Sequence, residues 1–203
     1  MIKSIDKPLC GKNIDKITDG IAEQSGGVLL HCCCGPCATA VVESLLPFVK
    51  PTLYYYNPNI QPREEYEKRL VELEKVAKYF GVDLIAEPYF EQEFTAKVKG
   101  LESEKEGGAR CPVCFSLRLS RTAQKASELA LPYFATTLTV SPHKDAQLIN
   151  GIGYAIEDKM GVKWLPSDFK KRDGYRRSVE LSSQLSLYRQ RYCGCLYGKE
   201  EQK

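Results

Sequence analysis

The feature that most constrains this chain is a run of cysteines directly after an apolar stretch, Val28-Leu29-Leu30-His31-Cys32-Cys33-Cys34-Gly35-Pro36-Cys37. The apolar residues predict a buried strand over 28–32, and Pro36 suits the first turn of a helix over 36–48. Adjacent cysteines seldom bond to each other, because a disulfide needs a particular Cα separation and dihedral angle. So many thiols in one strand-to-helix turn indicate a metal centre with thiolate ligands.

The other cysteines are also grouped, with the exception of Cys10. Cys111 and Cys114 form a Cys-x-x-Cys pair, and Cys193 and Cys195 form a Cys-x-Cys pair. The first residues lack the apolar core of a secretory signal, and no apolar run is long enough to span a bilayer. We therefore expect a cytoplasmic protein with no membrane partner. In that reducing compartment, nine cysteines indicate ligand and redox chemistry rather than a disulfide framework.

The order of predicted elements indicates the fold class. The expected strands cover 28–32, 52–56, 82–86, 133–140 and 162–165, and the expected helices cover 14–23, 36–48, 63–80, 90–99, 111–131, 145–160 and 178–192. This alternation predicts an α/β three-layer sandwich with a mostly parallel central sheet. The length of 203 residues and the hydrophobic content of 43% fit an extension over 1–25 followed by one domain over 26–203.

Several polar turns directly follow predicted strands. They are the cysteine turn, Asn57-Pro58-Asn59, Ser141-Pro142-His143 and Ser167-Asp168. Ligands of parallel α/β folds bind beyond the carboxyl ends of the strands, so we expect these turns to converge there. His143 and Asp168 are candidate proton donors or ligands, although each could also be a surface or capping residue. His31, within a strand, is more typical of a hydrogen-bonded core histidine.

The type of metal stays open on spacing alone. A four-cysteine zinc site is common, but structural zinc sites usually use two Cys-x-x-Cys-like turns. Adjacent cysteines point their side chains apart, which suits a larger [4Fe-4S] core equally well. One of the three consecutive cysteines could instead be a buried core thiol, and Cys32 fits that alternative best. The Cys193–Cys195 loop is short and can close into a labile disulfide, which favours a redox dithiol over an inert terminal pair or a metal-ligand pair.

Seven ordered motifs cover about residues 28–196: His31-x-Cys33-Cys34, Tyr56-Asn57-Pro58-Asn59-Ile60, Arg110-Cys111-Pro112-x-Cys114-Phe115-x-x-Arg118-Leu119, Thr136-Thr137-Leu138-x-x-Ser141-Pro142-His143-Lys144, Asp168-Phe169-Lys170-Lys171, Gly174-Tyr175-x-Arg177-Ser178-x-Glu180-Leu181-Ser182 and Tyr188-Arg189-Gln190-x-Tyr192-Cys193-Gly194-Cys195. Together they resemble the cobalamin-independent epoxyqueuosine reductase family, QueH. The resemblance implies a fold similar to adenine-nucleotide hydrolase-like domains. It also implies reduction of epoxyqueuosine at the tRNA wobble position to queuosine.

The resemblance further implies the cofactors and the residues that would serve them. Cys33, Cys34, Cys111 and Cys114 would bind a [4Fe-4S] cluster in the domain over 26–203, and Cys193 and Cys195 would be the redox-active pair. An additional mononuclear iron would lie beside the cluster, with Cys37 and Asp168 as its candidate ligands. The implied partners are tRNA carrying epoxyqueuosine and an electron donor.

Three other classes of protein compete with this enzyme. A tRNA-thiolating ATP enzyme would need a Ser-Gly-Gly-x-Asp-Ser loop after the first strand, whereas Ser25-Gly26-Gly27 precedes that strand here. A zinc-stabilised RNA-binding module would use the cysteines structurally. A thiol–disulfide redox subunit would also use adjacent cysteines, but it would have no use for the basic loop from Lys170 to Arg177, which is suited to phosphate contact.

Overall fold

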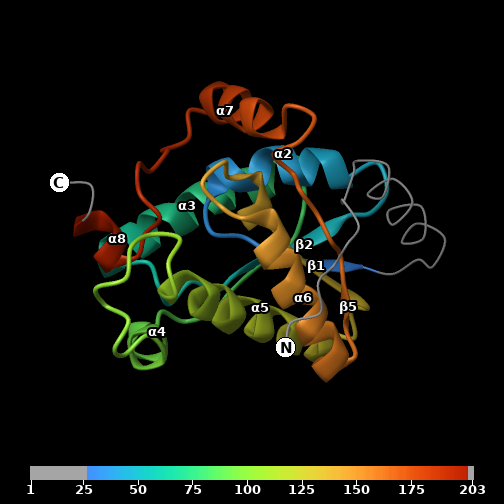
Figure 1. The fold of residues 1–203 in the computed structure, drawn as a ribbon. Coiled ribbons are helices and arrows are strands. Elements are labelled where there is room, and N and C mark those ends of the chain that lie inside the picture. Colours follow the sequence, from blue (N-terminus) through green and yellow to red (C-terminus); the bar gives the residue numbers. More distant parts are fainter. Residues whose placement is uncertain (1–26, 201–203) are drawn as a thin grey trace.

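A computed structural model describes residues 27–200 of the chain (Figure 1). Its centre is a five-stranded sheet with the order β3-β2-β1-β4-β5, in which every neighbouring pair is parallel. The strands are β1 (Val28–His31), β2 (Pro51–Tyr55), β3 (Leu84–Ala86), β4 (Tyr133–Thr136) and β5 (Lys163–Trp164). This confirms the predicted α/β fold with a parallel sheet. The short helix expected over 14–23 and Cys10 lie outside the described residues.

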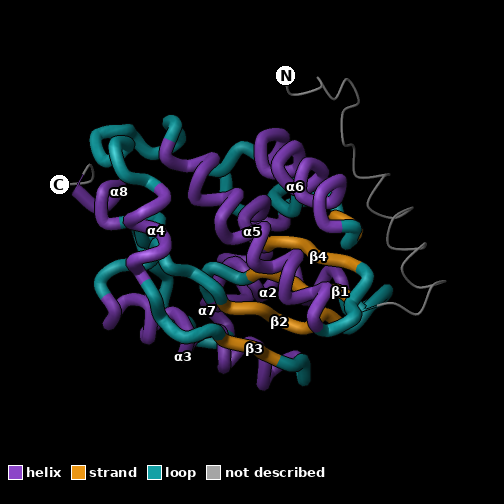
Figure 2. The backbone as a smooth tube through the Cα atoms, turned by 90° about the horizontal axis from the view of Figure 1, so that it is seen from below, coloured by secondary structure: helices purple, strands orange, loops and turns teal. Residues whose placement is uncertain are grey.

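Helices cover both faces of the sheet, so the domain has three layers (Figures 1 and 2). One layer contains α2 (Gly35–Leu45), α3 (Arg63–Phe80) and α7 (Gly174–Gln184), and the other contains α5 (Arg110–Glu128) and α6 (Ala146–Met160). The alternation of β1 explains this arrangement. Val28 and Leu30 pack into the core on the α2 side, and Leu29 packs into the core on the α5 side. All three side chains are fully buried.

Two short helices lie at one end of the domain. They are α4 (Glu91–Lys97) and α8 (Leu196–Glu200) (Figures 1 and 2). Phe94 of α4 and the following Val98 form a small apolar cluster with Cys114 and Cys195. The sequence pattern predicted no helix after residue 192, so α8 is an addition that the structure makes.

The predicted strand over 133–140 is wrong in its second half. Residues Thr137–Val140 form a 3-10 turn, η1, because the Thr136 hydroxyl accepts a hydrogen bond from the Leu138 N–H at 3.2 Å and turns the chain. The last long helix was also misplaced. It begins at Gly174, where an added Cβ would lie 1.8 Å from the Phe169 carbonyl oxygen, and it ends at Gln184.

The structure confirms that polar turns gather beyond the carboxyl ends of the strands. Asn57, after β2, donates a side-chain hydrogen bond to the Cys32 carbonyl at 2.8 Å. Thr139 and Ser167, which follow β4 and β5, share a hydroxyl hydrogen bond at 2.9 Å. Among the described helices, none is both long enough and apolar enough to cross a membrane.

The packing of α6 on β5 gives a stability prediction with a matched control in the same helix. A Cβ at Gly153 would lie 2.3 Å from the Trp164 ring, whereas a Cβ at Gly151 would meet nothing within 4 Å. We expect Gly153→Ala to lower the free energy of unfolding by about 1–3 kcal/mol through overpacking. Gly151→Ala should leave it unchanged or raise it by up to about 1 kcal/mol. Urea unfolding of both variants checks this, and equal midpoints would contradict it.

Candidate active site

Three thiols meet where β1 turns into α2. Cys33 and Cys34 follow the strand and Cys37 lies in the first turn of the helix, and their sulfur atoms all lie within 4.8 Å of one another. The Cys33 and Cys34 sulfurs are 3.8 Å apart. Gly35 permits this turn, because a Cβ there would lie 2.6 Å from the Glu72 carbonyl oxygen of α3. This three-thiol group could hold a metal.

Hydrogen bonds within the three-thiol group shift the pKa values of its thiols in opposite directions. The hydrogen bonds of Cys33 with Cys34 and Cys37 hold the pKa of Cys33 well below its usual value. The same contacts and burial raise the pKa of Cys37. One sulfur is therefore stabilised as an anion, and a bound cation would displace the protons of the others. The group has the chemistry of a thiolate metal site.

Two neighbouring residues behave as the sequence predicted. Cys32 is fully buried in the hydrophobic core, and its thiol donates to the Leu30 carbonyl at 3.3 Å, which confirms it as a core thiol. His31 is also fully buried, with ring nitrogens 2.9 Å from the Thr136 hydroxyl and 3.3 Å from the Tyr56 carbonyl oxygen. Burial lowers the pKa of His31 to about 3, so its ring is neutral at physiological pH.

The other four cysteines line one small cavity. Cys111 and Cys114 come from the first turn of α5, and Cys193 and Cys195 come from the segment before α8. The remaining lining residues include Phe94, Glu106, Arg110, Phe115 and Gly198. The Cys111 sulfur accepts a hydrogen bond from the Gly107 N–H at 3.2 Å. The thiols are thus arranged in two groups, and the Cys-x-x-Cys pair shares its cavity with the Cys-x-Cys pair.

Arg118 of α5 connects the two groups electrostatically. Its side chain is 1% exposed, and its Nη1 donates to the Asn57 side chain at 3.4 Å. Burial opposes its charge, but the negative charge that nearby cysteines can carry raises its pKa, with Cys114 the largest contributor, followed by Cys193 and Cys33. Its Nη2 is buried without a hydrogen-bond partner. A buried cation with a free N–H beside thiols fits an anionic group between them.

Other buried polar atoms at this edge also lack a hydrogen-bond partner. Among the described side chains these are both amide atoms of Asn59, Asp168 Oδ1 and Gln190 Oε1. Buried polar atoms are seldom left unsatisfied in folded proteins. The residues present therefore fit a site that is completed by a bound polar or metal-containing group.

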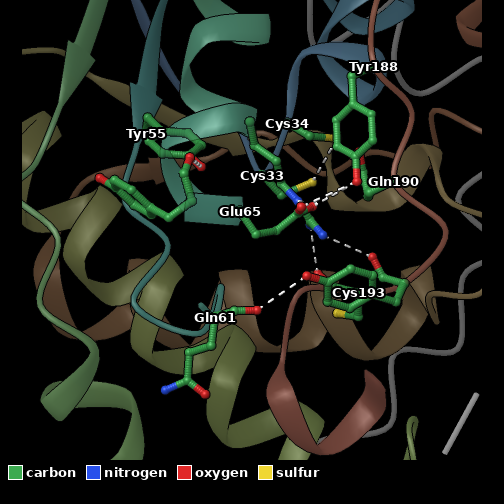
Figure 3. Close-up of polar contacts among 11 residues, drawn as sticks. Cys33, Cys34, Tyr55, Gln61, Glu65, Tyr188, Gln190 and Cys193 are labelled. Carbon is green, nitrogen blue, oxygen red and sulfur yellow. Dashed lines mark hydrogen bonds and ion pairs between the residues drawn. The ribbon is translucent and has the colours of Figure 1, made fainter. Parts of the chain in front are cut away.

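Residues 185–195, which we call the strap, carry the Cys-x-Cys pair along α3. The N–H of Tyr188 donates to Glu72 at 3.0 Å, and Arg69 donates to the Cys193 carbonyl at 3.0 Å. Figure 3 shows the strap beside the three-thiol group, where Gln190 Nε2 lies 3.0 Å from the Cys34 sulfur. The strap therefore brings Gln190 into contact with Cys34, one of the cysteines that follow β1.

Gly194 is required by the conformation of the strap. Its φ is +105°, and its carbonyl accepts from the Gln61 N–H at 2.8 Å. An added Cβ would lie 2.9 Å from both Arg69 Nη1 and Ile60 Cγ1. The glycine lets the two cysteines sit on either side of a turn that presses against α3.

The two predicted proton donors lie in different environments. His143 is exposed, and the structure turns the adjacent Lys144 inward instead. The Asp168 side chain is 14% exposed, with its carboxylate oxygens 3.8 Å and 3.6 Å from the ammonium groups of Lys170 and Lys171. The structure brings neither of them into the three-thiol group.

Much of the basic loop is paired within the domain. Arg177 forms two hydrogen bonds with Glu43 of α2, at 2.8 Å and 2.7 Å. The exposed Arg176 lies 3.5 Å from Asp173 and 3.4 Å from Glu180. The loop therefore also anchors α7 on α2.

The sequence patterns assigned no role to the buried arginines or to Gln190, although Arg118 and Gln190 stand in two of the family motifs. Arg69, which stands in no motif, lies on the apolar face of α3 between Tyr66 and Leu73. A charged residue on an apolar helical face was the available signal for it. Nothing local indicated the role of Gln190, because its contact with Cys34 joins residues 156 positions apart.

The fold and the site together define the class of protein: a parallel α/β protein whose clustered thiols, at the carboxyl edge of its sheet, could hold a metal. The model of one family, epoxyqueuosine reductase QueH, matches residues 28–201. The chain belongs to the epoxyqueuosine reductase QueH family, whose members are oxidoreductases.

Relatives that carry the same name are similar over most of their length. The epoxyqueuosine reductase QueH of Streptococcus pyogenes serotype M1 is 45% identical over 181 residues, which is 86% of this chain and 71% of that protein. The protein of the same name from Staphylococcus epidermidis is 42% identical, over 86% of this chain and 77% of the relative. The protein of the same name from Thermotoga maritima is 40% identical, over 88% of this chain and 93% of the relative.

The three-thiol group predicts opposite results for two adjacent cysteines. Cys34→Ala removes a sulfur from the group, so we expect the anaerobically purified variant to lose most of its bound metal. Cys32→Ala removes a core thiol that makes no contact with the group's sulfurs in the described structure, so metal content should stay at the wild-type level. Elemental analysis per chain checks both, and equal metal loss in the two variants would contradict the assignment.

Proposed function

We propose that this chain reduces epoxyqueuosine in tRNA to queuosine, with a [4Fe-4S] cluster and the Cys193–Cys195 dithiol as its redox groups. Family membership carries the proposal, because the relatives named for this activity align with 84–88% of the chain. The clustered thiols support a metal-dependent redox reaction. We place the enzyme in the cytoplasm with its tRNA substrate.

We assign Cys33, Cys34, Cys111 and Cys114 as cluster ligands. The first two lie at the carboxyl end of β1, and the second two lie in the first turn of α5. The Arg118 guanidinium interacts with thiolates of both pairs, which supports an anionic group between them. Cys37 lies within reach of Cys33 and Cys34 and remains our candidate ligand for an additional iron, with Asp168 as a second candidate.

The overall reaction sets what the chain's own groups must supply. Conversion of an epoxide to an alkene consumes two electrons and two protons and releases water. When bound, the cluster would carry single electrons, and an adjacent iron would polarise the epoxide oxygen. Oxidation of Cys193 and Cys195 to a disulfide releases two electrons, which matches the electron count, together with the protons that the two sulfurs still carry. An external electron donor must then restore the dithiol.

Proton supply and tRNA binding fall to the polar loops at the same edge. Asp168 and His143 are the candidate proton donors, each on a loop that follows a strand of the sheet. The anticodon is single-stranded, so the modified base can be splayed into the site. The candidate phosphate contacts are Lys170, Lys171, Arg172, Arg176, Arg177, Arg189 and Arg191.

The cluster assignment is tested with Cys111→Ser. Loss of one of four thiolate ligands should remove most of the brown iron–sulfur chromophore and lower turnover by at least about 100-fold. Cys32→Ala is the matched control and should keep both properties. A Cys111→Ser protein with full chromophore and turnover would overturn the ligand assignment, and a colourless wild-type protein that holds zinc would overturn the cluster.

The dithiol is tested separately with Cys193→Ser. The chromophore should persist, because this sulfur is not an assigned ligand, while turnover of epoxyqueuosine-containing tRNA should fall by at least about 100-fold. Absorbance and product analysis of the same anaerobic sample check both properties. Normal turnover with a strong reductant would make Cys193 and Cys195 a structural pair.

A further inference from the structure

Lys144 is a buried cation that the proposed reaction does not yet use. It follows η1 directly after Ser141-Pro142-His143, and its side chain is 9% exposed. Its Nζ donates to Glu106 Oε1 at 2.8 Å and to the Cys193 sulfur at 3.3 Å. Its position is fixed further by Lys170, whose ammonium donates to the Lys144 carbonyl at 2.8 Å.

An ammonium group is rarely buried unless anionic groups surround it. Burial alone would lower the pKa of Lys144, but Cys193 and Glu106 hold that pKa above its usual value. The lysine therefore stays charged at physiological pH. Glu106 accepts one of its three N–H groups, and a second is directed at sulfur. A hydrogen bond from a charged donor favours the thiolate form of its sulfur acceptor.

The second sulfur of the pair has a different environment. Cys195 is 7% exposed and packs with Phe94, Val98 and Cys114. Apart from Cys114, these neighbours are apolar and do not stabilise a negative charge. The charged or titratable groups that face Cys193 are Lys144, Glu106, Arg118, Cys114 and Cys195, and Arg69 binds its carbonyl. Of the two cysteines, only Cys193 accepts a hydrogen bond from a side-chain ammonium in the described structure.

We propose that Lys144 is a positioning residue that donates a charged hydrogen bond to the Cys193 sulfur and stabilises the thiolate that reacts there, with Glu106 fixing the ammonium group in place. The inference rests on the proposed redox role of Cys193 and Cys195. Oxidation of this pair forms the sulfur–sulfur bond, releases two electrons and frees one proton, that of Cys195. Both electrons and that proton go to the epoxide, and the second proton that water formation requires is drawn from solvent.

The proposal has a consequence for the redox equilibrium. A cation that stabilises the thiolate stabilises the reduced pair, which makes the corresponding disulfide more oxidising. Removal of the Lys144 charge should therefore make the disulfide harder to reduce and Cys193 less nucleophilic. Both properties can be measured without turnover.

The test compares Lys144→Met, which keeps the length of the side chain without its charge, with the conservative Lys144→Arg. The anaerobic holoprotein is treated with iodoacetamide and digested with trypsin. Cleavage after Arg191 and Lys199 yields one peptide with both cysteines, and its fragment ions report each site. We expect Cys193 to react faster than Cys195 in the wild type. Lys144→Met should slow Cys193 on the order of tenfold, with a smaller change at Cys195, and Lys144→Arg should restore much of the rate.

Equilibration with glutathione redox buffers gives a second readout in the same proteins. A tenfold loss of thiolate stabilisation corresponds to a disulfide potential about 30 mV lower in Lys144→Met. Glu106→Gln keeps the lysine, so Cys193 should remain the faster-reacting sulfur in that variant. If Lys144→Met fails to fold, the relative reactivity of the two cysteines in Glu106→Gln is the test.

Two outcomes would overturn the role of Lys144. One is equal reactivity of the two cysteines in the wild type or in Glu106→Gln, and the other is an unchanged Cys193 rate and disulfide potential in folded Lys144→Met. Neither outcome bears on the proposed reductase activity, which Cys193→Ser and Cys111→Ser test by turnover and chromophore. Conversely, a fully active Cys193→Ser protein would show that the reaction does not need the dithiol. It would not bear on the contact between Lys144 and Cys193 in the wild-type protein.

Discussion

The parallel pairing of β1 with β2 on one side and with β4 on the other is the constraint on which the site depends. His31 lies level with Tyr54 and Thr136 in this register, so the three strands end together. The hydrogen bond between the His31 ring and Thr136 then ties two of those ends. The cysteine turn, the Asn57 loop and η1 consequently begin at one edge of the sheet. The three-thiol group lies at that edge.

Buried arginines hold the irregular segments around this edge. Arg69, Arg110 and Arg118 are among the largest fully buried side chains of the described domain. Arg110 donates to the carbonyls of Leu101, Glu102 and Glu104, so the loop before α5 wraps around its guanidinium. Each arginine donates several hydrogen bonds in a fixed planar fork, which suits it to organising backbone that has no regular partners. This arrangement also places positive charge beside the cysteines. Negative charge on a cysteine sulfur offsets the free-energy cost of burying an arginine.

The local hydrophobic pattern predicted the helices and strands that bury apolar surface. It failed where contacts with distant residues determine the conformation of the backbone. The strand at 28–32 and the helix at 63–80 were recognisable, because their apolar residues follow the expected periods and Gly81 ends the helix. The polar edge was also predictable from strand order. The helix expected over 178–192 was misplaced because Glu72 captures the N–H of Tyr188, 116 residues away, and no local rule reports such a partner. The sequence also pointed to His143 at this edge, but no local pattern indicated that its neighbour Lys144 is the residue that turns inward.

The strap has a consequence for how the protein is assembled during synthesis. The cysteines that follow β1 and those of α5 are synthesised before residues 185–195. Three hydrogen bonds help to hold the strap: Arg69 donates to the Cys193 carbonyl, the Gln61 N–H donates to the Gly194 carbonyl, and Glu72 accepts from the Tyr188 N–H. The segment that contacts Cys34 is therefore the last part of this site to be added during synthesis.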